Sequence, residues 1–163
     1  MGVAGSGKTA VAQAMAERWG DVFIEADDLH SASNVQKLSS GIPLDDHDRT
    51  PWLRAVGERI RSEASDNQRT VTSCSALKRA YRDVLREYAP AAFFVELDAP
   101  FNVARSRVAS RRHSFMSPSL LESQFATLEP LAVDERGMRV DATNSLDGIV
   151  DIVGRALAAE SPT

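Results

Sequence analysis

Apolar residues form two kinds of pattern that alternate along the chain: stripes typical of amphipathic helices and short runs typical of buried strands. From Thr9 to Trp19 they fall at positions 11, 15 and 19, which is the stripe of an amphipathic helix. Short apolar runs typical of buried strands follow at 22–24, 69–77, 91–99 and 138–143. Helical patterns separate them at 50–64, 77–88, 101–112, 117–130 and 146–157. This alternation predicts an α/β fold with a parallel sheet and helices on both faces.

The helix expected at 50–64 begins with residues that are typical of a helix N-terminus. Thr50 is a suitable N-cap, and Pro51 would then occupy the first turn, where its missing N–H does no harm. Trp52, Val56 and Ile60 would line the buried face of this helix.

Composition places few restrictions beyond those of an ordinary globular protein. The 163 residues suit one domain, 1–163, and the net charge of −4 gives no support for binding nucleic acid. No apolar run approaches the roughly 20 residues that span a bilayer, and no signal peptide is recognisable. The single cysteine, Cys74, cannot form an internal disulfide, so we expect a cytoplasmic protein that binds no membrane.

The stretch GVAGSGKT at 2–9 matches the phosphate-loop pattern G-x-x-x-x-G-K-[ST] at every fixed position. Its glycines let backbone N–H groups turn inward around a polyphosphate. Lys8 would place its charge on the β- and γ-phosphates, and the Thr9 hydroxyl would coordinate Mg²⁺. We therefore expect ATP and Mg²⁺ as cofactors, with the nucleotide bound by Gly2, Gly5, Ser6, Gly7, Lys8 and Thr9.

A phosphate loop normally follows a buried strand, and here only Met1 precedes it. Three explanations are open. The native chain begins upstream with about six to ten further apolar residues, which is the explanation we favour. Alternatively, another subunit or the tail supplies the strand, or the shortened product folds poorly and is inactive.

Polar residues follow each predicted strand, and in parallel sheets such residues gather at the ligand-binding edge. Glu25 and Asp27 lie two apart after the first strand, so both face one side if the strand persists. In a kinase, a small-molecule hydroxyl, the acceptor, attacks the phosphate. Asp27 is our candidate for the base that takes the proton of this hydroxyl and for a residue that binds it. The alternative is that Asp27 only caps a helix.

Two large classes of phosphate-loop protein do not fit. The N-K-x-D motif of GTPases is absent, and the second strand ends TSCSAL without the acids of motor and transporter ATPases. The sequence instead resembles the gluconate kinase (gluconokinase) family, a family of small P-loop kinases related to shikimate kinase. The resemblance covers the phosphate loop and the segments 26–53, 74–86 and 115–130.

The resemblance implies ATP-dependent phosphorylation of D-gluconate at its 6-hydroxyl. It implies a three-layer P-loop kinase fold with strand order 2-3-1-4-5, counting the absent strand as the first. It also implies a helical acceptor region at about 28–66, a lid at about 107–119 and a homodimer. In related kinases an acid at the position of Glu25 helps to hold Mg²⁺, so Glu25 joins Thr9 as a predicted metal ligand.

The acceptor region carries the family pattern H-x-x-x-N-x-x-K at His30, Asn34 and Lys37, which would form one polar stripe on a helix. His30 and Lys37 would hydrogen-bond a polyhydroxy acid, unless the stripe is only a solvated face. Arg49 either binds the acceptor or holds its loop in place.

Lys78 and Arg82 lie four residues apart, so they would share one helix face and both reach a gluconate carboxylate. An exposed basic helix is the alternative. In the predicted lid, Arg107 and Arg111 would neutralise charge in the transition state, together with Lys8. The family's Gly-His-Phe reads His113-Ser114-Phe115 here, which puts any contact by that histidine in doubt.

Two other functions stay open at this point. The chain could phosphorylate another small sugar acid or hydroxy acid, because the phosphate chemistry would be shared. It could also be a catalytically disabled module that binds nucleotide without transfer, given the missing strand and the altered lid.

Overall fold

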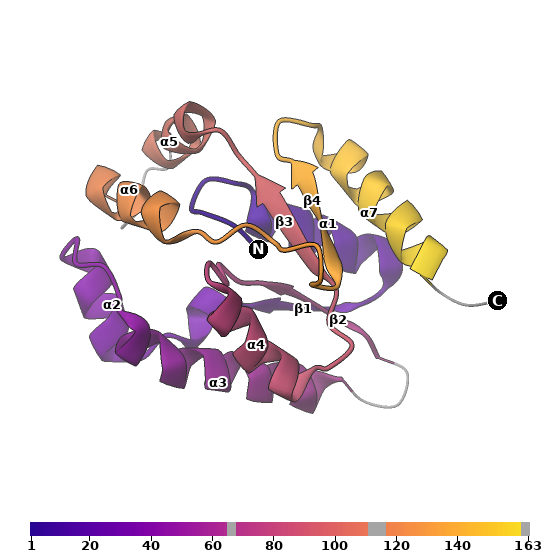
Figure 1. Cartoon of the computed structure of the whole chain (residues 1–163), viewed down its shortest axis with the longest axis horizontal. Helices are drawn as coiled ribbons and strands as arrows, with labels where there is room; N and C mark the ends of the chain where they lie inside the picture. Colours follow the sequence, from indigo (N-terminus) through magenta and orange to yellow (C-terminus); the bar gives the residue numbers. More distant parts are fainter. Residues whose placement is uncertain (65–67, 111–116, 161–163) are drawn as a thin grey trace.

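The computed structural model describes residues 1–64, 68–110 and 117–160, in which helices and strands alternate (Figure 1). In chain order the elements are α1 (Lys8–Trp19), β1 (Val22–Glu25), the 3-10 helix η1 (Ala26–Leu29), α2 (Ala32–Ser39), α3 (Asp46–Glu63), β2 (Thr70–Ser73), α4 (Arg79–Tyr88), β3 (Phe94–Asp98), α5 (Phe101–Ala109), α6 (Pro118–Thr127), β4 (Gly137–Asp141) and α7 (Leu146–Glu160). No helix in the described ranges is long and apolar enough to cross a membrane.

The strands form two parallel pairs. β1 pairs with β2, with Glu25 opposite Ser73, and β3 pairs with β4, with Asp98 opposite Asp141. The parallel α/β prediction is therefore confirmed. In the predicted numbering these pairs are the neighbours 2-3 and 4-5, and the full order around a central first strand stays a prediction.

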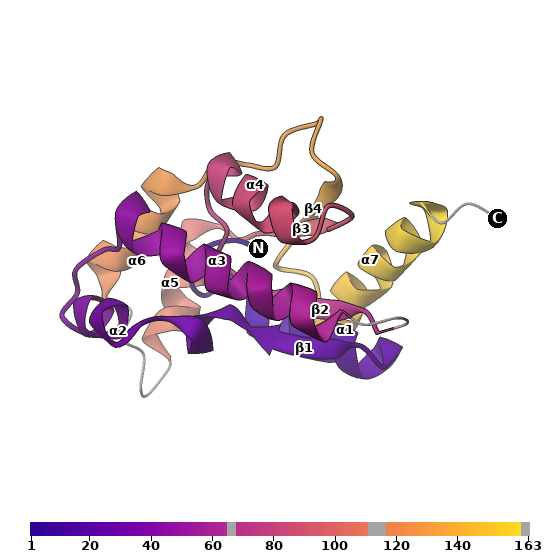
Figure 2. The ribbon, with the colours of Figure 1, turned by 90° about the horizontal axis from the view of Figure 1, so that it is seen from below.

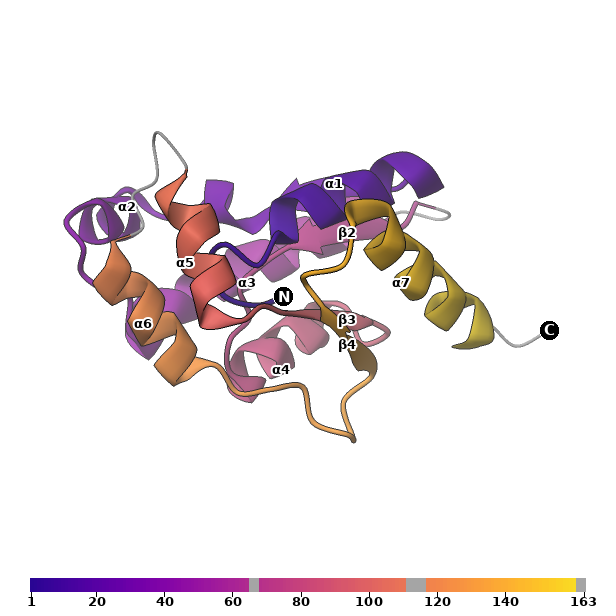
Figure 3. The same cartoon turned by 90° about the horizontal axis from the view of Figure 1, so that it is seen from above.

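Helices cover both faces of the strands (Figures 2 and 3). On one face α1 and α7 pack together, and they bury Val11, Met15 and Val153. On the other face α3 and α4 pack together, and they bury Trp52 and Leu85. Because each strand pair lies between two helix layers, its carboxyl end is the part left open to a ligand.

α3 begins five residues earlier than the sequence pattern predicted, with its N-cap at residue 45 instead of 50. Its N-cap is Asp45, whose side chain accepts from the backbone N–H of Asp48, while the Asp48 side chain accepts from the N–H of Asp45. This reciprocal capping box satisfies two N–H groups at once and fixes the start at Asp46. Thr50 is therefore not the N-cap, and Pro51 lies inside the helix.

Candidate active site

The phosphate loop runs from Gly2 to the start of α1, and its shape depends on glycine. Gly5 has φ +77°, and a Cβ there would lie 2.4 Å from the backbone oxygen of Ala104. Gly7, at φ +100°, is the N-cap of α1 and gives the helix no side-chain cap. The first N–H groups of α1 are thus left for an anion, as the motif predicts.

Two polar side chains of the loop turn inward. Lys8 Nζ donates to the backbone oxygen of Val3 at 2.9 Å, so the lysine folds back over the loop. Ser6 is buried, and its Oγ has no hydrogen-bond partner in the described part of the chain. A loop that holds a lysine and an unpaired buried hydroxyl together suits a polyphosphate ligand.

The predicted metal ligands lie together at the end of β1. Thr9 Oγ1 donates to Glu25 Oε2 at 2.8 Å, and Ser73 Oγ at the end of β2 lies 3.4 Å from Thr9 Oγ1. No group of three or more histidine, cysteine or acidic side chains that could hold a metal occurs in residues 1–64, 68–110 and 117–160. Mg²⁺ needs few protein ligands beside substrate phosphates and water, so a hydroxyl next to one carboxylate fits it.

Arg107, near the end of α5, reaches the phosphate loop. Its Nη2 donates to the backbone oxygen of Ala142 at 2.9 Å, and its Nη1 lies 3.4 Å from the carbonyl oxygens of Gly5 and Ser6. The guanidinium therefore lies against the phosphate loop. Arg111 and His113 lie outside the described residues.

Asp27 follows β1 within η1, and its side chain is 73% exposed. Its Oδ1 lies 3.8 Å from Nε2 of His30, which stacks on the Trp52 ring at 4.3 Å between centroids. Trp52 is fixed in turn by donating from Nε1 to the backbone oxygen of Ala26 at 2.7 Å. The Asp27 carboxylate is thus accessible to an acceptor molecule, and it lies next to the stacked rings of His30 and Trp52.

The environment of His30 keeps its imidazole neutral near pH 7. Burial lowers the pKa of His30 below its ordinary value, the Asp27 carboxylate opposes this shift, and Arg49 adds to it. A neutral ring can both donate and accept a hydrogen bond, which suits a hydroxyl-rich ligand. The shared helical stripe is wrong for His30, because Ser31 is the N-cap of α2 and His30 precedes the helix.

The two lysines that were predicted to bind the acceptor molecule form ion pairs with aspartates. Lys37 Nζ lies 2.6 Å from Asp48 Oδ1, and Lys78 Nζ lies 2.7 Å from Asp46 Oδ1. Each ion pair lowers the pKa of its aspartate. Lys78 lines a cleft of about 410 Å³ that also contains Asp46 and Tyr81, so it remains next to open space.

Arg49 is buried and lies beside that cleft. Its Nε donates to the backbone oxygen of Leu44 at 3.2 Å, and its guanidinium carbon is 5.7 Å from the centroid of the Tyr81 ring. Lys78 Nζ is 5.4 Å from the same centroid. Two cations therefore flank Tyr81, and both of the open interpretations of Arg49 remain compatible with its position.

Arg82 does not fit the role predicted for it. Its side chain is 1% exposed, and its guanidinium makes two hydrogen bonds to Glu135, at 2.7 and 2.6 Å. It also donates to the backbone oxygens of Ala76 and Glu129. Lys78 is the N-cap of α4 and precedes the helix, so the two cations do not share a helix face.

Gln124 on α6 is a contact that the sequence pattern gave no reason to single out. Its Oε1 accepts from the backbone N–H of Ala4 in the phosphate loop at 2.7 Å. The two residues are 120 positions apart, so no local spacing signals the contact. The helix that follows the predicted lid is thereby joined to the loop.

Replacing Gln124 with leucine should lower kcat/KM for ATP by about tenfold, because a partly buried N–H of the loop loses its acceptor. Steady-state kinetics with ATP varied would measure this. Glu122→Leu, an exposed change on the same helix, is the matched control and should change kcat/KM by less than about twofold. Equal kinetics in the two variants would show that the contact has no part in catalysis.

Parallel strands between helix layers, a phosphate loop at the start of α1, and a hydroxyl–carboxylate pair beside it define a P-loop kinase acting on small molecules. A family model described as an AAA domain matches residues 1–131. The thermoresistant gluconokinase of Escherichia coli K12 is 40% identical over 151 residues, which are 92% of this chain and 86% of that protein. The chain belongs to the gluconokinase family.

Solved structures agree with this assignment. A gluconokinase from Sinorhizobium meliloti 1021 is 43% identical, with a TM-score of 0.83, and the match covers 99% of this chain and 95% of that one. An unliganded sugar kinase from Janibacter sp. HTCC2649 is 44% identical, with a TM-score of 0.91, and the match covers 97% of this chain and 91% of that one.

Proposed function

We propose that the chain transfers the γ-phosphoryl group of ATP to the 6-hydroxyl of D-gluconate and releases 6-phospho-D-gluconate and ADP. The observation that carries this proposal is the placement of Thr9, Glu25 and Asp27 near the carboxyl end of β1. Thr9 and Glu25 touch each other beside the phosphate loop, and Asp27 follows two residues later with an exposed carboxylate. The residues that we propose as metal ligands and as the base thus lie next to one another.

The chain's contribution to this reaction is positioning and charge neutralisation. Lys8, Arg107 and the N–H groups at the start of α1 would bind the phosphates, with Arg111 as a further proposed cation. Thr9 and Glu25 would hold Mg²⁺, which neutralises charge on the β- and γ-phosphate oxygens when it is bound. Asp27 would accept the proton of the attacking hydroxyl.

We propose that the acceptor lies between Asp27 and the cleft beside Lys78. Neutral His30 would hydrogen-bond gluconate hydroxyls, with Lys37 at the edge of the site. Arg49 and Lys78 would bind the carboxylate, which would compete with Asp46 for Lys78. Arg82 is left out of this site, because its hydrogen bonds already go to Glu135 and to backbone oxygens. The homodimer and the cytoplasmic location stay predictions.

The test is ATP turnover coupled to D-gluconate with Mg²⁺, comparing the wild type with Asp27→Asn. Loss of the base should lower kcat by about 10²- to 10⁴-fold. Asp28→Asn, an exposed neighbour in the same 3-10 helix, is the matched control and should stay within about twofold of the wild type.

A panel of sugar acids in the same assay separates the alternatives. Turnover with another acid in place of gluconate would identify a different acceptor. ATP binding without turnover for any acceptor would identify a disabled module. Equal turnover by Asp27→Asn and the wild type would overturn the assignment of the base.

A further inference from the structure

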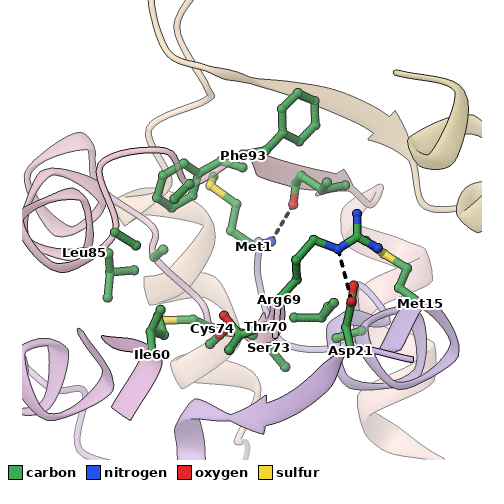
Figure 4. Close-up of a pocket in the computed structure, with 18 of the residues that line it drawn as sticks. Met1, Met15, Asp21, Ile60, Arg69, Thr70, Ser73, Cys74, Leu85 and Phe93 are labelled. Atoms are coloured by element: carbon green, nitrogen blue, oxygen red, sulfur yellow. Dashed lines mark hydrogen bonds and ion pairs between the residues drawn. The ribbon is translucent and has the colours of Figure 1, made fainter. Parts of the chain in front are cut away.

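Two cavities of the protein differ in what they offer to a charged ligand. The larger one, of about 760 Å³, is lined mainly by apolar side chains, among them Met1 and Ile60 (Figure 4), and these do not favour a charge. The smaller one, of about 410 Å³, is the cleft beside Lys78, which Asp46 and Tyr81 also line. An acidic group that enters the smaller cleft meets an ammonium group and a phenol hydroxyl, and both can donate hydrogen bonds to it.

A carboxylate of the protein itself lies in this smaller cleft. Lys78 Nζ donates to both side-chain oxygens of Asp46, at 2.7 and 2.8 Å, and the Tyr81 hydroxyl donates to Asp46 Oδ1. The hydrogen bonds from Lys78 and Tyr81 lower the pKa of Asp46 below its ordinary value, and Arg49 acts in the same direction. Asp46 is therefore charged near pH 7, and the cleft has the donors that a carboxylate requires.

The Asp46 carboxylate is held only at the surface of the protein. Asp46 is the first residue of α3, and its side chain is 65% exposed. The start of α3 is fixed by the capping box between Asp45 and Asp48, and the Asp46 side chain is directed instead at Lys78 and Tyr81. Because exposed ion pairs contribute little to stability, the Asp46 carboxylate can leave Lys78 at small cost.

We propose that Asp46 is an internal mimic of the acidic end of the acceptor, and that a sugar acid binds by displacing the Asp46 carboxylate from Lys78 and Tyr81. This inference rests on the proposed function and adds to it how the site selects its acceptor. The exchange replaces one carboxylate by another, so both donors remain paired.

A neutral sugar or polyol cannot make the same exchange. Such a molecule either leaves Asp46 in place, which blocks the cleft, or separates the ion pair without offering a charge in return. Asp46 therefore discriminates against acceptors that lack a carboxylate, in addition to the attraction that Lys78 provides for those that have one.

Asp46→Asn should raise the affinity for D-gluconate, because an amide competes for the Lys78 ammonium less strongly than a carboxylate does. Isothermal titration calorimetry should give a Kd for D-gluconate about fivefold lower than that of the wild type. D-Glucitol, which carries a hydroxymethyl group in place of the carboxylate, should bind more weakly to both proteins. Its Kd should differ between them by less than about twofold.

Asp83→Asn is the matched control for the loss of one negative charge. Asp83 lies on α4 and is exposed, and its carboxylate pairs with Arg86 at 2.7 Å instead of lining the cleft. The Kd of this variant for D-gluconate should stay within about twofold of the wild type. Thermal unfolding of each variant would verify that folded protein is titrated.

A second background separates exchange at Lys78 from a general effect of charge. In Lys78→Met the ammonium for which the two carboxylates compete is gone. Adding Asp46→Asn in this background should therefore change the Kd for D-gluconate by less than about twofold, so that the two substitutions are coupled by most of the fivefold gain.

The outcomes distinguish this inference from the proposed function. A Kd for D-gluconate that is unchanged or higher in Asp46→Asn would overturn the inference alone, and a higher one would assign Asp46 to the positioning of Lys78. A gain that D-glucitol shares, or one that persists in Lys78→Met, would also overturn the inference. A wild type that binds no D-gluconate would overturn both the inference and the proposed function.

Discussion

Replacement of Lys8 by methionine is expected to lower kcat for gluconate-dependent ATP turnover by at least about 10³-fold. Methionine keeps the length and apolar stem of the side chain but removes the charge that we place on the β- and γ-phosphates. The loss should be in kcat more than in KM, because charge on the transferring group is greatest in the transition state. Steady-state kinetics with ATP and gluconate varied separately would measure both constants.

A structural effect of this substitution can be separated from a catalytic one. Lys8 donates to the backbone oxygen of Val3, and losing that hydrogen bond should cost only about 1 kcal/mol of stability. Lys8→Arg restores the charge with a planar group of different geometry and should recover part of the activity. A Lys8→Met protein that unfolds near the wild-type temperature but keeps more than a tenth of the wild-type kcat would contradict our assignment of the phosphate loop.

Replacement of Arg82 by methionine should reduce the free energy of unfolding by about 3–5 kcal/mol. The substitution leaves the Glu135 carboxylate buried without its main partner, although Arg86 at 2.7 Å still binds it. For a chain of this size the expected fall in Tm is about 6–20 °C. Denaturant unfolding monitored by circular dichroism would give the free energy directly.

The pH dependence of this effect has a definite sign. Hydrogen bonds from Arg82 hold the pKa of Glu135 at about 2 in the folded protein. The carboxylate therefore stabilises the fold above its ordinary pKa of 4.5, and this stabilisation is lost as the pH falls toward 2. The stability difference between the wild type and Arg82→Met should accordingly shrink over that range.

The double variant Arg82→Met, Glu135→Leu is the control for a buried ion pair. Removing both charges should be less damaging than removing one, because no uncompensated charge remains. If Arg82→Met left stability unchanged and raised KM for gluconate instead, Arg82 would be a substrate ligand after all, as its place in the sequence first indicated.

The elements built on local patterns were predictable from the sequence. The apolar stripe predicted α1, the apolar runs predicted the four strands, and the glycines of the loop predicted its position at the start of α1. The start of α3 was a different matter. The signal was local, because Asp45 and Asp48 have capping-box spacing, but Thr50 before Pro51 gave an equally local and competing signal.

The parts of the site that the sequence could not predict depend on long-range contacts. Arg82 was assigned to the substrate because it lies four residues from Lys78 and because a planar guanidinium pairs well with a carboxylate. Its actual partner, Glu135, lies 53 residues away and shows no periodicity that links it to Arg82. The contact of Gln124 with Ala4 has the same character, since only the folded chain brings α6 against the loop.

The uncapped start of α1 has a consequence for how stability and activity are balanced. Serine, threonine or aspartate at the N-cap stabilises a helix by only about a few tenths of a kcal/mol relative to glycine, and its side chain would take the N–H groups that a phosphate needs. With Gly7 in that position the ligand itself completes the helix. The enzyme thus forgoes stability when empty and recovers it only when it is loaded with nucleotide.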